Sequence, residues 1–178
     1  DRQVRYAYNM YGDLTIRESA DKECQEFFHY TKDGRLSSAI GGGMRYDYDY
    51  YQNGFLRSKK ASGKTLLHYE YDRNGNKIKQ ADITGKVLEY RYNNLDLLTE
   101  IYDNGNRQAC YDYNPDGTIL KMIIGKDLLT EYEYDSDQNI TGLRTLFGKD
   151  LLVNNRYQFD RNGNQVTKKT IGGFTSYQ

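Results

Sequence analysis

The sequence is built from a short motif that recurs along its whole length. The motif is a pair of aromatic residues separated by one residue, and the second aromatics fall at positions 8, 30, 50, 71, 92, 113, 134 and 159. Successive copies are therefore 22, 20, 21, 21, 21, 21 and 25 residues apart, and we interpret residues 1–178 as a single region of about eight repeats. The pairs, called anchors below, are Tyr6/Tyr8, Phe28/Tyr30, Tyr48/Tyr50, Tyr69/Tyr71, Tyr90/Tyr92, Tyr111/Tyr113, Tyr132/Tyr134 and Tyr157/Phe159.

The residues that follow each anchor predict a tight turn. The next position is mostly Asp or Asn, the residue types that open turns, as in Asp72, Asp135 and Asp160. Four residues after the anchor, two copies have Asp96 and Gln138, and six have glycine, which adopts a positive φ without strain. These glycines are Gly12, Gly34, Gly54, Gly75, Gly117 and Gly163.

An aliphatic residue comes two positions after the glycine position in six copies. The two copies that read DRNGN place Ile78 and Val166 one residue later, and we expect a local β-bulge to explain this slip. A second glycine-bearing turn falls near the middle of each unit. Each unit therefore reads as strand, Asx-Gly turn, strand and glycine turn, with strands of about six to eight residues. The 25-residue spacing before the last anchor, around residues 147–155, predicts a lengthened hairpin.

The faces of the expected sheet follow from alternation along each strand. The two aromatics of an anchor share one face, so successive units predict ladders of tyrosines across the sheet. Alternation also predicts that polar and apolar residues are mixed on both faces. Leu98, Glu100 and Tyr102 would lie on one side, with Thr99 and Ile101 on the other.

The composition fits a sheet that contacts water on at least one face. The chain has 19 tyrosines, no tryptophan and one proline, and its mean hydropathy is −0.93. An aromatic content of 14% argues against disorder, which goes with few aromatics. The 25 basic and 25 acidic residues cancel, which argues against nucleic-acid binding and a polybasic membrane contact. No apolar run approaches the length of about 18 residues that a spanning helix needs. We expect the chain to be an excised piece of a longer polypeptide, whose targeting signal would lie elsewhere.

The repeat resembles the YD-repeat, or RHS (rearrangement hotspot), family, whose units follow the pattern Tyr-Asp-x-x-Gly-(Asn/Arg)-Leu. Residues 71–76 are the clearest copy, and residues 92–96 and 134–139 are degenerate copies without the glycine. The resemblance extends from Tyr6 to about Gln178. It implies an all-β fold in which tandem hairpins form a long, curved antiparallel sheet, an arc of a spiral shell. Bacterial members and insect-pathogen toxin complexes enclose a C-terminal toxin in such a shell, and teneurins carry a related shell at the cell surface.

Several residues were weighed as chemical sites. The Asp-rich turns at residues 72–76 and 160–164 lack the spacing of an EF-hand calcium loop, so they predict turns and no metal site. Cys24 and Cys110 predict neither a disulfide nor a zinc site, because alternation places them on opposite faces four units apart. His29 and His68 flank anchors and are interpreted as residues of the sheet. Residues 114–117, which read NPDG, occupy the ordinary turn position of their repeat.

The sequence thus favours a structural protein over an enzyme, and it predicts no cofactor. The first hypothesis is a shell segment of a large secreted or cell-surface protein that helps to encapsulate or present a C-terminal toxin domain. Its partners would be the remaining repeats and the C-terminal domain of the same parent chain. The alternative is a carbohydrate-binding or adhesion module for cell-surface glycans, because exposed tyrosines can stack on sugar rings. Bare edge strands would also allow edge-to-edge self-association of the fragment.

Overall fold

The computed structural model describes residues 3–177, and every regular element in that part of the chain is a β-strand. This confirms the all-β fold of tandem hairpins. The strands are β1 (Val4–Tyr8), β2 (Leu14–Ser19), β3 (Gln25–Tyr30), β4 (Leu36–Gly41), β5 (Met44–Tyr50), β6 (Leu56–Ala61), β7 (Lys64–Tyr71), β8 (Lys77–Asp82), β9 (Val87–Tyr92), β10 (Leu98–Asp103), β11 (Asn106–Tyr113), β12 (Ile119–Ile124), β13 (Leu128–Tyr134), β14 (Ile140–Phe147), β15 (Asp150–Phe159), β16 (Gln165–Thr170) and β17 (Gly173–Ser176).

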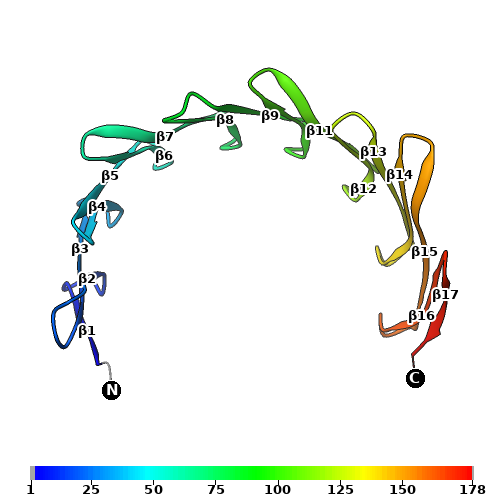
Figure 1. Cartoon of the computed structure of the whole chain (residues 1–178), viewed down its shortest axis with the longest axis horizontal. Helices are drawn as coiled ribbons and strands as arrows, with labels where there is room; N and C mark the ends of the chain where they lie inside the picture. Colours follow the sequence, from blue (N-terminus) through cyan, green and yellow to red (C-terminus); the bar gives the residue numbers. More distant parts are fainter. Residues whose placement is uncertain (1–2, 178) are drawn as a thin grey trace. The chain divides into compact units, whose positions relative to one another are not determined.

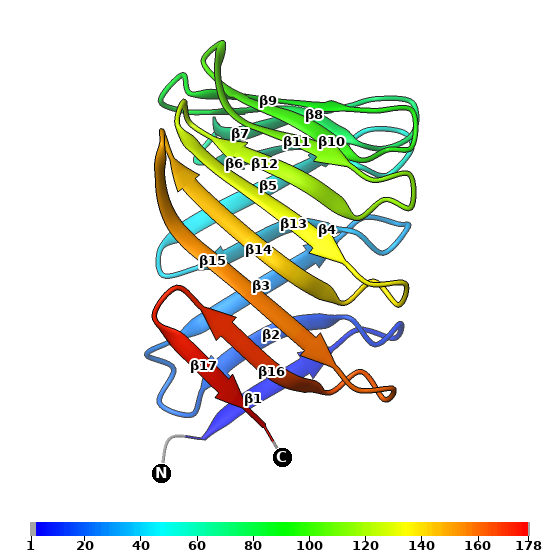
Figure 2. The same cartoon turned by 90° about the vertical axis from the view of Figure 1, so that its right-hand side faces the viewer.

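The chain divides into two compact units, Asp1–Val87 and Leu88–Gln178. In the first unit each strand from β1 to β7 pairs antiparallel with the next strand along the chain. The second unit repeats this connectivity from β9 to β17. Figure 1 shows that the sheet of each unit is curved, and Figure 2 shows β12 to β17 side by side in the second unit.

Each repeat contributes two strands and two turns. An anchor strand ends on the aromatic pair, the Asx-Gly turn follows, and a return strand leads to the second hairpin. The expected lengthened hairpin is present, because β14 and β15 have 8 and 10 residues and pair from Gly142 with Arg156 to Phe147 with Asp150. The last strand, β17, pairs with β16.

A β-bulge follows the Asx-Gly turn in all eight copies. In the first copy Tyr8 pairs with Leu14 and Ala7 with Ile16, so Thr15 is the extra residue. The same shift occurs in the DRNGN copies, where Tyr71 pairs with Lys77. The expectation that a bulge distinguishes those two copies was therefore wrong. Ile78 itself is the bulged residue there. The corresponding bulges in the other copies are at Ser37, Arg57, Thr99, Leu120, Thr141 and Val166.

The bulge also changes which residues share a face. Directly paired residues of an antiparallel sheet point to the same side. Leu98 pairs with Tyr92 and Ile101 pairs with Tyr90, so both aliphatics lie on the face of the anchors, called the anchor face. Glu100 pairs with Arg91 on the opposite face. The prediction that Leu98 shares a side with Glu100 was wrong, because one extra residue at the bulge inverts the alternation.

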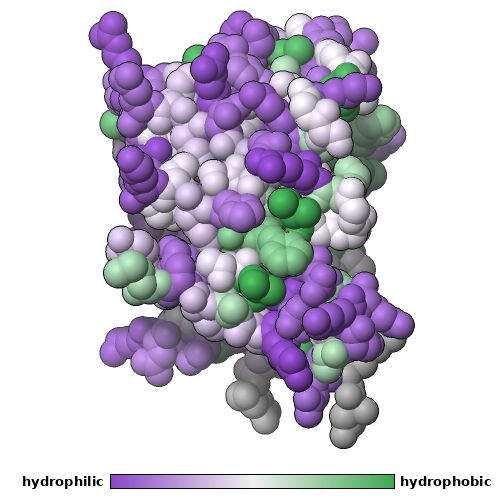
Figure 3. All heavy atoms as spheres, turned by 90° about the vertical axis from the view of Figure 1, so that its left-hand side faces the viewer, coloured by the Kyte–Doolittle hydropathy of each residue, from purple (hydrophilic) through white to green (hydrophobic). Residues whose placement is uncertain are grey.

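The two faces are consequently different in chemistry. The anchor face carries the aromatic pairs, and most of the residues opposite them are aliphatic. Basic residues such as Arg17, Lys59 and Lys168 also lie opposite anchors. The opposite face carries cross-strand ion pairs such as Arg91–Glu100 at 3.0 Å and Arg144–Glu131 at 3.3 Å. In the first unit this face also holds a short apolar row, in which Ile16 pairs with Phe27 and Phe27 with Ile40. Figure 3 shows a largely hydrophilic surface on that unit with small, scattered apolar groups.

The sheet is a single layer without a deep core. Among the described residues, the buried hydrophobic ones are only the small Ala61 and Ala109, and no side chain is fully buried. Thr130 is also buried, and its hydroxyl lies 3.2 Å from that of Thr145 on the paired strand. Stability must therefore come largely from contacts within the sheet and between successive repeats.

Candidate functional site

The junction between successive repeats is the site that the sequence motif builds, and its first part is the Asx-Gly turn. In all eight copies the N–H of the first turn residue donates to the carbonyl of the fifth, and the N–H of the fourth donates to the carbonyl of the first. In the copy that begins at Asp72, these bonds are 2.9 Å to Asn76 and 3.3 Å from Gly75. One backbone geometry therefore serves all eight copies, which have seven different turn sequences.

The side chain of the first turn residue closes the loop. Oδ1 of Asp72 accepts the N–H groups of Asn74 and Asn76, each at 2.9 Å, and Asn76 Nδ2 donates to Oδ2 at 3.0 Å. The same three bonds recur around Asp135 and Asp160. Because these donors stabilise the carboxylate, the side-chain hydrogen bond from the asparagine first, the pKa of Asp72 lies below its ordinary value of 3.8. The pKa values of Asp135 and Asp160 are lowered in the same way.

The first turn residue need not be a carboxylate. Asn9 accepts the N–H groups of Tyr11 and Asp13 through Oδ1, and its Nδ2 donates to Asp13 at 2.9 Å. In this copy asparagine is the first turn residue and aspartate the fifth. In the copies at Asp72, Asp135 and Asp160 the order is reversed. The fifth turn position was not predicted as part of the motif, although the complementary spacing of Asp and Asn signals it in the sequence.

The fourth turn position has a positive φ in every copy. The six glycines there have φ between 80° and 94°. Asp96 and Gln138 occupy the same position with φ of 59° and 64°. A residue with a Cβ adopts this conformation at a cost, so these two turns are locally strained.

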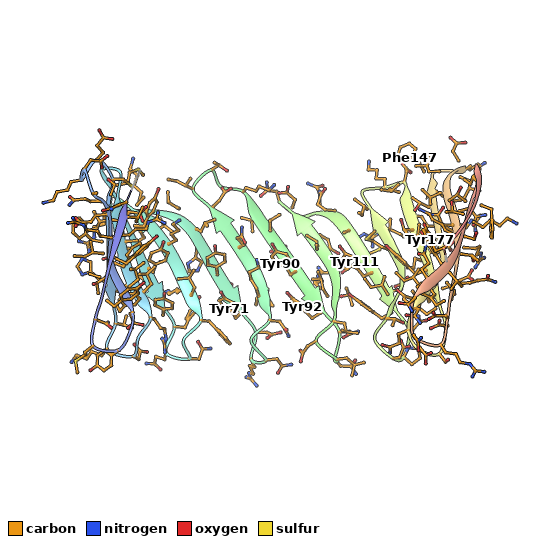
Figure 4. The ribbon with its side chains drawn as sticks, turned by 90° about the horizontal axis from the view of Figure 1, so that it is seen from below. Tyr71, Tyr90, Tyr92, Tyr111, Phe147 and Tyr177 are labelled. Atoms are coloured by element: carbon orange, nitrogen blue, oxygen red, sulfur yellow. The ribbon has the colours of Figure 1, made fainter. Side chains whose placement is uncertain are left out.

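The second part of the junction is a hydrogen bond from the second anchor tyrosine to the preceding repeat. The hydroxyl of Tyr113 donates to the carbonyl of Leu98 at 2.7 Å. The same bond joins Tyr30 to Leu14, Tyr50 to Leu36 and Tyr134 to Ile119, at 2.7 to 2.9 Å. Each acceptor is the residue just before the bulge. Figure 4 shows Tyr90, Tyr92 and Tyr111 on successive anchor strands of the second unit.

The sequence predicted ladders of tyrosines across the sheet, and the tyrosines of successive anchors are not direct neighbours in such a ladder. A return strand separates consecutive anchor strands, so the residue paired with Tyr111 is Met122 and the residue paired with Tyr48 is Lys59. Lys59 places its ammonium 4.3 Å from the ring centre of Tyr46, a cation–π distance. The contact that recurs between repeats is therefore a hydroxyl-to-carbonyl bond.

Burial raises the pKa of the second anchor phenols. The shift is upward for Tyr30, Tyr50, Tyr113 and Tyr134, and desolvation is its largest cause in each. These phenols stay protonated through the neutral range, which the donor role requires.

Two repeats depart from this junction. In the third repeat an aromatic clamp replaces the polar turn side chains, because Phe55 stacks on Tyr71 at 4.9 Å and Tyr51 meets the same ring edge-on at 6.2 Å. The Tyr51 hydroxyl also donates to the carbonyl of Tyr69 at 2.9 Å. In the eighth repeat Phe159 stands where the others have tyrosine, so it has no hydroxyl to offer to Ile140.

The other residues singled out in the sequence lie apart from one another. His29 is exposed on β3, and His68 lies on β7 with Nε2 3.9 Å from Glu70. Cys110 is half-buried on β11, whereas Cys24 is exposed in the loop before β3, so strand alternation does not apply to it. Asn114 begins an Asx-Gly turn, as expected. Within residues 3–177, no cluster of three or more His, Cys, Asp or Glu side chains could hold a metal ion. No helix suited to crossing a membrane occurs there.

Tandem antiparallel hairpins, joined by an Asx-Gly turn and a tyrosine hydroxyl, define a single-layer β-repeat protein. No protein-family model matches the chain. It is 30% identical over 118 residues to the tRNA nuclease WapA of Bacillus subtilis strain 168, a match that covers 65% of this chain and 5% of that protein. It is 25% identical over 111 residues to the probable deoxyribonuclease RhsB of Dickeya dadantii, covering 62% of this chain and 8% of the other.

Solved structures share the fold. The crystal structure of TcdB2-TccC3 without its hypervariable C-terminal region matches with a TM-score of 0.62 at 16% identity, over 94% of this chain and 11% of that one. The TcdB2-TccC3 structure matches with the same TM-score and identity, over 12% of its length. The chain thus spans a small part of every protein named here. With the eight motif copies, these findings confirm the resemblance to YD/RHS repeats.

Proposed function

We propose that this chain is a wall segment of a YD/RHS shell, and that the shell encloses a C-terminal toxin domain of the same parent protein. The observation that carries the proposal is the single-layer sheet with two chemically different faces. Its aromatic anchor face suits contact with other polypeptide, and its ion-paired face suits contact with water. The names of two relatives, a tRNA nuclease and a probable deoxyribonuclease, support a parent whose C-terminal domain acts on nucleic acid.

The segment serves this role as structure and not as an enzyme. Its polar side chains are engaged in turns and cross-strand pairs that recur with the repeat, as expected of architecture. The remaining repeats and the enclosed domain would be its partners. The parent would act outside the cell that makes it, either secreted or at the cell surface.

The test uses the full-length protein that contains this segment. Its C-terminal domain should resist protease while the repeats are intact, because the wall excludes the protease. Deleting residues 114–124 removes one turn and one strand, so every later strand would run in the wrong direction and the wall would break. Rapid cleavage of the C-terminal domain in this variant is expected. Equal protection in both proteins would count against enclosure.

Carbohydrate binding through stacked tyrosines has weaker support. Apart from Tyr8, which is exposed, the second anchor residues are half-buried, and four of their hydroxyls already donate to backbone carbonyls. A sugar would have to displace those bonds or use the first anchor rings. Binding to a glycan array that is lost when Tyr111 is replaced by alanine would revive this alternative.

A further inference from the structure

Within the first unit, neighbouring Asx-Gly turns contact one another through the side chain at the fifth turn position. In the third repeat this residue is Phe55, which is 37% exposed. Its ring stacks on that of Tyr71, the second anchor residue of the fourth repeat, with the ring centres 4.9 Å apart. Tyr71 is the last residue of β7 and is labelled in Figure 4. The fifth turn residue of one repeat therefore packs where the next turn begins.

The same phenylalanine ring covers the glycine at the fourth position of the next turn. A Cβ on Gly75 would lie 2.7 Å from Cζ of Phe55 and 3.2 Å from its Cε2. Two carbon atoms in contact prefer a separation of about 3.5 to 4.0 Å, so a side chain at Gly75 would have to displace the ring. Because the ring is stacked on Tyr71, its displacement would cost an aromatic contact.

Arg35 repeats this arrangement one repeat earlier. Its guanidinium carbon lies 5.5 Å from the ring centre of Tyr50, which is a cation–π distance. A Cβ on Gly54 would lie 3.1 Å from the same carbon. An ion pair to Asp33 at 2.6 Å also holds the guanidinium. The tip of an arginine side chain has several rotatable bonds, so the crowding at Gly54 is milder than at Gly75.

Other residues at the fifth position leave the next glycine uncrowded. Asp13 precedes the turn of Gly34, and a Cβ on Gly34 would meet no atom of the described residues within 4 Å. Leu97 is intermediate, because a Cβ on Gly117 would make an ordinary contact with its Cδ1 at 3.8 Å. The crowding therefore depends on the size and stiffness of the fifth turn residue.

The two copies without glycine at the fourth position follow short residues. Gln138 comes one repeat after Thr118 in the second unit. Along the sequence, Asp96 likewise comes one repeat after Asn76. The repeats that follow Arg35 and Phe55 both keep the glycine, which agrees with the crowding around those two side chains.

We propose that the fifth turn residue of one repeat determines which repeat can follow it in the sheet. The partner of this turn surface is the next repeat of the same chain. A stiff ring such as Phe55 accepts only a repeat with glycine at the fourth turn position, whereas a short residue such as Thr118 also accepts a residue with a Cβ. Glycine thus has two roles, since Gly34 provides a positive φ and Gly75 also provides space. The inference goes beyond the enclosure of a domain, because it concerns the order of the repeats.

The first test compares Gly75→Ala with Gly34→Ala by urea unfolding of the 178-residue chain. Both replacements add a Cβ at a positive φ, of 94° and 80°, so the difference between them isolates the contact with Phe55. Gly75→Ala should raise the equilibrium constant for unfolding about tenfold more than Gly34→Ala does. When Phe55→Asn is also present, the two replacements should have equal effects, because the ring is gone. Equal effects in the parent chain would overturn the proposal.

The second test builds the same contact at another junction. Thr118→Phe should lower the urea midpoint, and Gln138→Gly should stabilise this variant more than it stabilises the parent chain. Asn139→Phe is the matched control, because Gly163 already follows it and a Cβ there would meet no described atom within 4 Å. It should lower the midpoint less than Thr118→Phe does. Equal stabilisation by Gln138→Gly in both chains would contradict the proposed selection. Neither test involves an enclosed domain, so their failure would leave the protease test of the wall unaffected.

Discussion

At the scale of single residues, the positive φ at the fourth position of the Asx-Gly turn has a free-energy cost that depends on which residue stands there. Gly117 has a φ of 87°, and Gln138 is held at 64° in the equivalent turn. Replacing Gly117 with alanine should destabilise the chain by about 1 kcal/mol, because a Cβ disfavours positive φ. Gln138→Gly should stabilise it by up to about the same amount. Urea unfolding would measure both, and Gly173→Ala is the control, since Gly173 lacks a positive φ and nothing crowds its Cβ position.

The turn aspartates make stability depend on pH in the acid range. Hydrogen bonds lower the pKa values of Asp72, Asp135 and Asp160 below 3.8, so their contribution is fully present above that pH. It is lost as the pH falls through the lowered values. The triple replacement by asparagine should fold, because Asn93 Oδ1 closes the same turn with Leu97 at the fifth position. It should lose less stability than the parent between pH 4 and about pH 2. An unchanged acid transition in a circular dichroism titration would contradict this role.

At the scale of the element, the hydroxyl-to-carbonyl bond joins one repeat to the next. Tyr113→Phe removes the bond to Leu98 and should cost about 1 kcal/mol in the free energy of unfolding. Tyr111→Phe is the matched control, since Tyr111 is the first aromatic of the same anchor and contributes through its ring. Equal stability of the two variants would show that the bond contributes nothing.

The same phenols predict instability in alkali. Burial raises the pKa values of Tyr30, Tyr50, Tyr113 and Tyr134 above the unfolded value of about 10. Their stabilising contribution is therefore complete below pH 10 and is lost as the pH rises through the folded values. Phenolate absorbance and circular dichroism should change together above pH 10. Ionisation of these phenols without loss of the sheet would contradict the expected coupling.

The period of the motif predicts the order of strands and turns but not every residue on each face of the sheet. The strands and turns were predictable, because tyrosine pairs and Asx-Gly steps mark their ends in every copy. The faces were not, because the bulge at Thr99 looks like any other strand residue, yet it inverts the alternation after Leu98. The acceptor of the Tyr113 hydroxyl was hidden for a related reason. It is a backbone carbonyl, which every residue has.

At the scale of the whole molecule, a repeat is the smallest piece that can be removed without disturbing the others. Each repeat contacts its neighbours through one strand pair and one junction, so stability should be close to a sum over repeats and interfaces. Deleting residues 114–134 removes one complete 21-residue repeat from the second compact unit. The deletion joins Tyr113 directly to Asp135. The anchor strand β11 would then pair with β14, with Tyr113 opposite Ile140 in place of Ile119.

This deletion should give a folded chain that is less stable than the parent, because one set of strand contacts is lost while every turn, bulge and face is kept in register. Deletion of residues 114–124 is the control, since it removes fewer residues but reverses the direction of every later strand. The shorter deletion should therefore be the more damaging of the two, with loss of the sheet signal and aggregation. Circular dichroism and size-exclusion chromatography distinguish the outcomes. If damage instead followed the number of residues removed, the repeat would not be the unit that holds this sheet together.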